Sequence, residues 1–161
     1  MGIFTSSGTK VFIGPAVTAV PADATAYAAL AFDEISYVKN AGEIGDQFQD
    51  VTTDHLGDGR TRHFKGQKDG GVMQLIVDRD DADAGQTALI AAVQDDSTAD
   101  YAFMVEFPNK RNPTGENAIR YFTGKAMGQR EGGLTPNSMT TMTVNVGINS
   151  DITYVASTAG A

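Results

Sequence analysis

Two groups of acidic and histidine side chains have the residue types of a metal site. The first, DRDDADAG, begins at Asp78 and has the acid density of a calcium-binding loop. An EF-hand starting there would place Ala82, Asp83 and Leu89 at positions that need a ligand, a turning glycine and a bidentate glutamate. We therefore predict that Asp81 or Asp83 caps a helix, because negative charge favours the positive end of the helix dipole.

The second group contains the two histidines of the chain, His55 and His63, which are separated by eight residues in a glycine-containing segment. Together with Asp54 or Asp58 they could supply zinc ligands, but their spacing does not define a tetrahedral site. The chain has no cysteine, which excludes thiolate metal sites and disulfides. We expect no metal and no cofactor.

Motifs of enzymatic catalysis are incomplete in this sequence. A G-x-S-x-G nucleophile elbow is absent, the segment TGKA lacks the rest of a phosphate-binding loop, and GDGRTR breaks the G-x-G-x-x-G pattern at Arg62. The sequence therefore predicts a protein that is not an enzyme.

Charge is strongly segregated in the middle of the chain. Residues 43–58 contain five acids and no Lys or Arg, whereas the nine positions from Arg60 to Lys68 contain four bases and no acid, in a chain of net charge −8. Either the acids face the bases within one hairpin, or the acidic side of one subunit meets the basic side of another. The residues that we expect at such a subunit contact are Asp54, His55, Asp58, Arg60, Arg62, His63, Lys65 and Lys68.

Composition limits the classes of protein further. A pI near 4.5 argues against general nucleic-acid binding, which requires Lys and Arg opposite phosphates. No segment approaches the roughly 20 apolar residues that span a bilayer, and the N-terminus lacks a signal-peptide pattern, so we expect no membrane association and synthesis in the cytosol.

Short strands separated by turn residues account for most of the chain. The best strand is SMTTMTVNVGIN, in which Met142, Val144, Val146 and Ile148 share one face. The segment DQFQDVTTD is able to pair with RTRHFKG, and DDADAGQTALIAAVQDD is the one convincing helix. We predict a mainly β (α+β) fold, an antiparallel β-sandwich or barrel of about seven to nine strands with one flanking helix near residues 81–95.

One domain is expected over residues 1–161. The small-residue segments at about 14–31 and about 150–161 are expected to be flexible arms, and a long loop or hairpin is expected at about 52–71.

The order of these elements resembles the major tail tube protein of long, non-contractile phage tails of the siphovirus type. The resemblance runs from about Glu43 to Ile148, through EIGDQFQD, GQKDGGVMQLIVD, DAGQTALIAAVQDD, YAFMVEFPN, RYFTGKAMG and MTTMTVNVGI. It implies hexameric rings that stack into a tube, with the hairpin reaching a neighbouring ring and DNA passing through without specific binding. Asp46 and Asp50 are candidates for an acidic lumen.

The resemblance also implies partners and a location. The partners are further copies of the chain, a tape measure protein, a tail terminator and baseplate or tail-tip proteins, and the location is the virion, assembled in the host cytoplasm. The alternatives are a tube protein of a contractile tail or secretion machine, or a tail terminator ring. A soluble binding β-barrel is the alternative from a different class.

Overall fold

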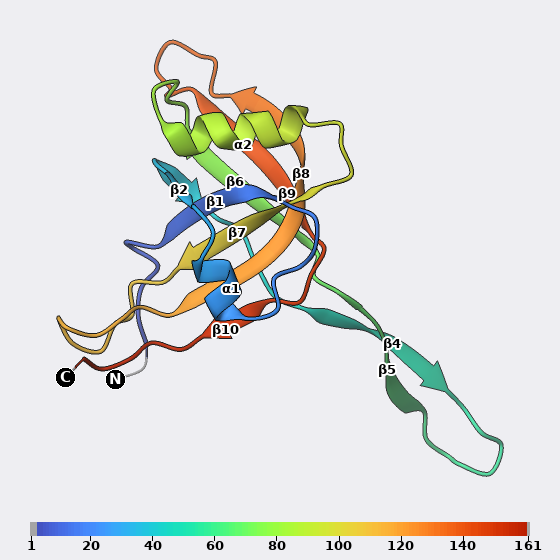
Figure 1. Cartoon of the computed structure of the whole chain (residues 1–161). Coiled ribbons are helices and arrows are strands. Elements are labelled where there is room, and N and C mark those ends of the chain that lie inside the picture. The colour runs from blue at the N-terminus through green and yellow to red at the C-terminus, as the bar shows by residue number, and fades with distance from the viewer. Residues whose placement is uncertain (1–2, 161) are drawn as a thin grey trace.

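A computed structural model describes residues 3–160, which form ten strands and two helices (Figure 1). The strands are β1 (Lys10–Val17), β2 (Asp33–Ile35), β3 (Val38–Asn40), β4 (Gln47–Thr53), β5 (Arg62–Asp69), β6 (Val72–Asp78), β7 (Asp100–Glu106), β8 (Ile119–Gly132), β9 (Thr141–Ile148) and β10 (Thr153–Val155). The helices are α1 (Ala24–Ala28) and α2 (Ala84–Gln94).

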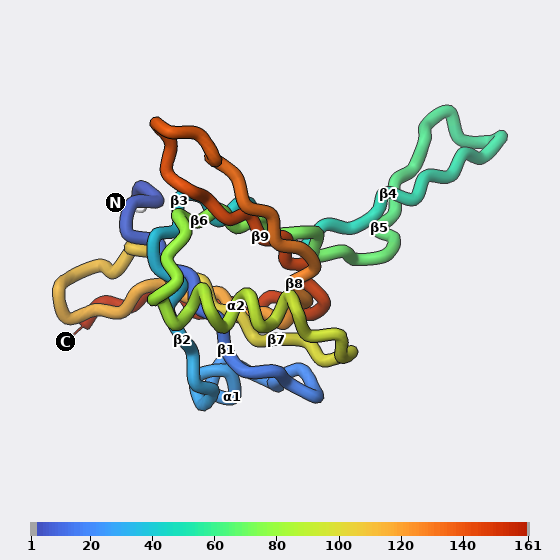
Figure 2. The backbone as a smooth tube through the Cα atoms, turned by 90° about the horizontal axis from the view of Figure 1, so that it is seen from above, coloured from blue at the N-terminus to red at the C-terminus, as the bar shows by residue number. Residues whose placement is uncertain are grey.

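Seven of the strands form one antiparallel path in the order β2-β1-β7-β8-β9-β6-β3, and β10 pairs with β8 beside this path. Seen from above in Figure 2, the β3–β6–β9 half faces the β2–β1–β7 half, with β8 at the bend between them. The long strand β8 pairs with both β7 and β9, and its register shifts at a bulge between Ala126 and Gly128. Bulges bend a strand, so this one helps the sheet to roll into a barrel.

The core lies between the two halves of the rolled sheet. In β9 every second residue, from Met142 to Ile148, is buried, which confirms the inward face that the alternation predicted. Met73, Leu75 and Val77 of β6 are buried beside them in register. Burial of this aliphatic face is the main favourable contribution to folding.

Helix α2 lies across the upper end of the rolled sheet in Figure 1, against β2 and β8. Its N-cap is Asp83, whose carboxylate accepts a hydrogen bond from the Gln86 backbone N–H at 2.9 Å. Leu89 and Ala92 are buried against the sheet. The helix and its acidic cap are therefore confirmed as the sequence predicted.

The expectation of a single helix was wrong, because residues 24–28 form α1, capped by Asp23. Tyr27 of α1 is fully buried and stacks on Tyr121 at a centroid distance of 5.1 Å. Strand β1 also continues through Pro15 to Val17. The segment that was expected to be a flexible arm at about 14–31 thus packs against the outer face of the sheet.

The C-terminal segment also contacts the sheet. β10 pairs with β8, and Glu116 forms an antiparallel bridge with Thr158. The second expected arm is therefore held along the barrel over most of its described length. No helix in the described part of the chain combines the length and apolarity needed to cross a membrane.

Candidate subunit interface

The hairpin of β4 and β5 projects from the barrel as a separate two-stranded sheet (Figures 1 and 2). Its paired residues run from Gln47 opposite Asp69 to Thr53 opposite Arg62. The pairing thus begins five residues before the expected start at residue 52, and a connecting loop joins the two strands. This hairpin carries every residue that the sequence singled out for a subunit contact.

One face of the hairpin is polar. Asp50 lies opposite Lys65 and Thr52 opposite His63 in the pairing register. The Asp50 carboxylate is 2.7 Å from His63 Nδ1, so the acid and the imidazole already interact within one chain. The Lys65 ammonium lies over the ring of Phe48, 4.9 Å from its centroid.

The opposite face is apolar near its centre, where Val51 lies directly opposite Phe64. Both side chains are about half exposed, at 50% and 55%. Gly66 follows Phe64 on this face, and a Cβ built on it would come within 2.7 Å of the Val51 side chain. The absence of a side chain at Gly66 therefore leaves room for the Val51 side chain.

The tip of the hairpin carries an ion pair and an exposed leucine. Arg62 Nε donates to Asp58 Oδ2 at 2.6 Å, although both residues are exposed enough for the pair to stabilise the fold only weakly. Leu56 is fully exposed. An apolar side chain in that position has no contact partner within its own barrel.

Lys68 fixes the base of the hairpin. Its ammonium lies 2.7 Å from Asp151, in the turn after β9, and 3.3 Å from Asp46. Hydrogen bonds to Asp151 and, to a smaller extent, Asp46 raise the pKa of Lys68. The two contacts tie the hairpin to the barrel at its root.

The structure brings all eight expected contact residues together on β5 and the loop before it, but it gives several of them partners in the same chain. Arg62, His63 and Lys68 pair with Asp58, Asp50 and Asp46 respectively. Among the described residues, Asp54 and Arg60 have neither a hydrogen bond nor an ion pair, and His55 contributes only its backbone carbonyl. The two lumen candidates, Asp46 and Asp50, are both in these pairs.

Sequence reasoning did not single out the large apolar side chains of the hairpin. Phe48, Val51, Leu56 and Phe64 are all exposed. Large apolar side chains in a segment that is otherwise densely charged are the sequence feature that could have indicated them. Assigning Val51 and Phe64 to one face required the observed register, which shifts between Phe48 and Asp50.

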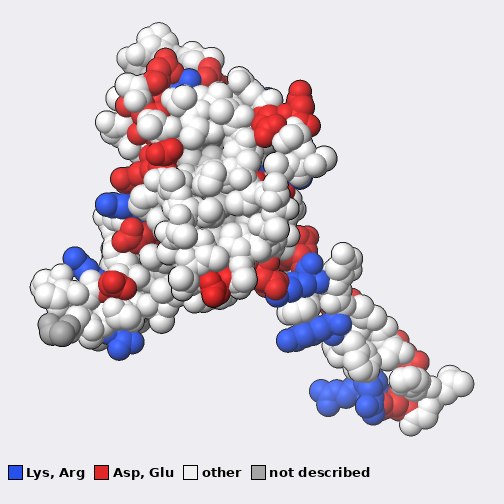
Figure 3. Space-filling model, in the orientation of Figure 1, with Lys and Arg blue, Asp and Glu red and all other residues white. Residues whose placement is uncertain are grey.

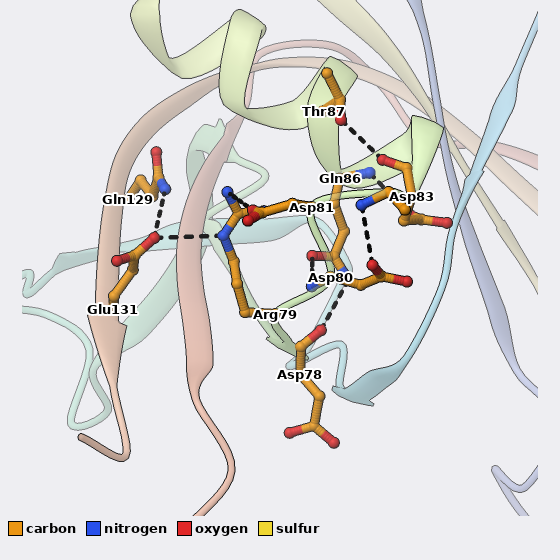
Figure 4. A network of polar contacts seen from close by, with 10 residues as sticks. Asp78, Arg79, Asp80, Asp81, Asp83, Gln86, Thr87, Gln129 and Glu131 are labelled. Atoms are coloured by element: carbon orange, nitrogen blue, oxygen red, sulfur yellow. Dashed lines mark hydrogen bonds and ion pairs between the residues drawn. The ribbon is translucent and has the colours of Figure 1, made fainter. Parts of the chain in front are cut away.

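The aspartate-rich segment before α2 holds the helix rather than a ligand (Figure 4). Asp81 pairs with Arg79 at 2.6 Å, and the Asp80 carboxylate accepts from the Ala82 backbone N–H. The Gln86 side chain bonds the backbone of Asp78 and Asp80. Across residues 3–160, the structure places no three His, Asp or Glu side chains where they could hold a metal ion together.

The barrel and its hairpin are similar in fold to a chain of a solved structure and match one protein-family model. A comparison with curated proteins gives no match. A chain in the solved structure titled "Cryo-EM structure of the anti-feeding prophage (AFP) baseplate, 6-fold symmetrised" is similar in fold, with a TM-score of 0.71 and 10% sequence identity. The similarity covers 97% of this chain and 98% of that chain.

The family model described as phage tail tube protein, TTP, matches residues 13–157, from within β1 to just beyond β10. The match therefore includes the rolled sheet, α2 and the projecting hairpin. On this match, the chain belongs to the phage tail tube protein family.

Proposed function

We propose that copies of this chain form hexameric rings, and that the rings stack into the tube through which DNA leaves a phage capsid. The family is one of structural virion proteins rather than enzymes. The six-fold symmetry named for the similar baseplate structure supports six copies in a ring. The tail would be long and non-contractile, as the sequence resemblance implies.

The observation that carries this proposal is the hairpin standing away from its own barrel (Figure 1). A two-stranded ribbon is at best marginally stable by itself in water, so one that exposes large apolar side chains gains stability from a second surface. A contact between different surfaces of identical subunits is heterologous, and such contacts generate rings or helical polymers. Asp54 and Arg60, which have no partner in the described chain, are proposed to contact a neighbouring subunit.

DNA would pass through the tube without specific binding. The net charge of −8 favours repulsion of phosphates, and Asp46 and Asp50 remain the proposed lumen acids. The further partners are a tape measure protein, a tail terminator and tail-tip or baseplate proteins. The alternative is a tube protein of a contractile tail or secretion machine, or a terminator ring; the structural likeness to a baseplate chain is the reason to retain it.

Negative-stain electron microscopy of the purified chain, alone and after concentration, tests the proposal. We expect hollow tubes with a regular axial repeat and a six-fold end view. Single rings that never stack would favour the terminator alternative. Particles that stay monomeric at every concentration, even when mixed with an isolated tail-tip complex that could nucleate a tube, would contradict the proposed function.

A further inference from the structure

We propose that the hairpin docks through the face that carries Val51 and Phe64, and that this apolar face packs against a second copy of the chain. The inference rests on the proposed function, because it concerns how the subunits of the tube hold one another. It adds an apolar contact to the one expected of the charged side chains, which lie at its edge.

The register defines the two faces. Val51 lies opposite Phe64, and one position along each strand Thr52 lies opposite His63. Directly opposed residues share a face and neighbours along a strand alternate. The side chains of Val51 and Thr52 therefore lie on opposite faces of the hairpin at adjacent positions of β4.

Desolvation favours burial of the apolar face. Val51 and Phe64 lose unfavourable contact with water when they are covered, and Gly66 leaves room for the Val51 side chain. The polar face carries the Asp50–His63 pair and Lys65, and covering those groups would remove them from water at a high energetic cost. Phe48 also lies on the polar face, beneath Lys65, and Arg62 lies two residues from Phe64 on the apolar face. The part of the hairpin suited to packing is therefore the centre of the apolar face, around Val51 and Phe64.

The hairpin does not use this face within its own chain. Of the residues that the structure describes, none between Gln47 and Asp69 belongs to either of the two apolar core clusters. The contacts of Lys68 with Asp46 and Asp151 hold the root, and beyond it the ribbon extends away from the barrel (Figure 2). The apolar face therefore needs a surface from outside the chain.

Charge complementarity points to a second copy as that surface. Residues 47–69 carry four acids and four bases, so the net charge of −8 lies on the rest of the chain (Figure 3). Arg62 and Lys68 are paired with acids of their own chain, which leaves Arg60 and Lys65 without an acidic partner among the described residues. In Figure 3 Lys and Arg gather along one side of the hairpin. Complementary potentials at the edge of an apolar contact fix register and orientation. The barrel of another copy provides such an acidic surface.

Two single-cysteine variants test the inference, because the chain has no cysteine of its own. Val51→Cys and Thr52→Cys place a thiol on opposite faces at adjacent positions. Each variant is labelled with a maleimide before and after assembly into tubes from purified chain alone. We expect the labelling rate of Val51→Cys to fall at least about tenfold on assembly, since a covered thiol reacts only while the contact is open, and that of Thr52→Cys to stay near its initial value.

The outcomes separate the inference from the proposed function. If tubes form but the thiol at 51 stays reactive, or only the thiol at 52 is protected, the proposed docking face is wrong. The proposed function of forming a tube is then unaffected. Protection at 51 that appears when a different tail protein binds, without the formation of tubes or rings, overturns the second copy as occupant. If the wild-type chain builds no tubes or rings, either alone or with a tail-tip complex, the proposed function fails and the inference fails with it.

A second pair of variants covers the case in which a cysteine itself disturbs assembly. Phe64→Ser removes the aromatic ring from the apolar face, whereas His63→Ser changes the polar face next to it. We expect Phe64→Ser to reduce the yield of tubes at least about tenfold, because it truncates a side chain that is buried in the contact. His63→Ser should change the yield less than about twofold, because its side chain stays exposed. Equal effects of the two variants would overturn the assignment of faces.

Discussion

At the scale of single residues, Gln86 joins α2 to the two edges of the rolled sheet. Its side chain is fully buried, and Nε2 donates to the carbonyls of Ser36 and Asp78 while Oε1 accepts from the Asp80 N–H. Three backbone groups from the β2–β3 connection and the end of β6 are satisfied by this one amide. A glutamine in that position is therefore a structural residue, although its polarity suggests a surface residue.

We expect Gln86→Ala to lower the free energy of unfolding by about 3 kcal/mol, because buried backbone groups that lose their partners keep the cost of desolvation. The control is Thr87→Ala, which removes one exposed hydrogen bond to the Asp83 carbonyl and should cost less than about 1 kcal/mol. Urea unfolding followed by circular dichroism measures both. Equal losses for the two variants would contradict the role of Gln86.

The helix cap Asp83 makes part of the stability depend on pH. Burial alone would raise the pKa of Asp83, but hydrogen bonds from Gln86 and Ser36 to the carboxylate outweigh it, and the pKa lies below its ordinary value. Because the folded-state pKa is the lower one, this contribution is complete above the ordinary aspartate pKa of about 3.9. It is lost as the pH falls through the folded-state value.

We expect the stability difference between the wild type and Asp83→Asn to shrink as the pH falls from about 6 to about 3, since the variant cannot titrate and the wild type loses its charged cap. Asp96→Asn is the matched control, because Asp96 is exposed and its carboxylate has no hydrogen bond or ion pair in the described chain. Urea unfolding at each pH gives the difference. A difference that is constant with pH would show that Asp83 titrates as it does in the unfolded chain.

At the scale of elements, the barrel and the hairpin are energetically separable. The hairpin contributes no side chain to the apolar core clusters among the residues described, and Lys68 links its root to Asp151 through an exposed ion pair. Folding of the barrel therefore depends on the elements that supply its core, which are β1, β2, β6 to β9 and α2, whereas assembly is proposed to depend on β4 and β5.

Replacing residues 47–69 by a short Gly-Ser turn is expected to leave the barrel folded with a melting temperature within about 4 °C of the wild type, the shift that about 1 kcal/mol produces in a domain of this size. The same variant should form no tubes. Thermal unfolding and electron microscopy provide the two readouts. Tubes built from the shortened chain would contradict the role of the hairpin, and a barrel that fails to fold would contradict its independence.

The sequence predicted the long elements better than the short ones. β9 was predicted from strict alternation and α2 from its acidic cap and apolar stripe, and both are local signals. β2, β3 and β10 have three residues each and α1 has five, too few to show a period. These elements exist because they pair with or pack on segments distant in the sequence, as Tyr27 does on Tyr121.

The sequence predicted which charged residues lie together on the hairpin, but not which apolar side chains share a face with one another. Unusual clustering of charge marked the hairpin, and the charged residues do lie together there. Which side chains share a face depends on strand register and on the shift between Phe48 and Asp50, and neither follows from composition. The apolar pair of Val51 and Phe64 became visible only in three dimensions.

At the scale of the whole molecule, two electrostatic effects act in opposite directions on assembly. Copies that each carry a net charge of −8 repel one another as they approach. Arg60 and Lys65, which have no acidic partner in the described chain, are proposed to attract the acidic barrel of a neighbour, and this attraction is local. Salt weakens both effects, because the Debye length falls from about 10 Å at 0.1 M to about 3 Å at 1 M.

The response of assembly to salt therefore shows which contact holds the hairpin. If Val51 and Phe64 provide most of the contact energy, screening removes the repulsion between copies and leaves the apolar contact intact. We then expect the assembled fraction, measured by sedimentation, to rise between about 0.1 M and about 1 M NaCl. Arg60→Glu should assemble less than the wild type at low salt, and the gap should close as salt is added, because only the charge at the edge has changed. An assembled fraction that falls with salt would instead show that ion pairs from β5 hold the subunits together.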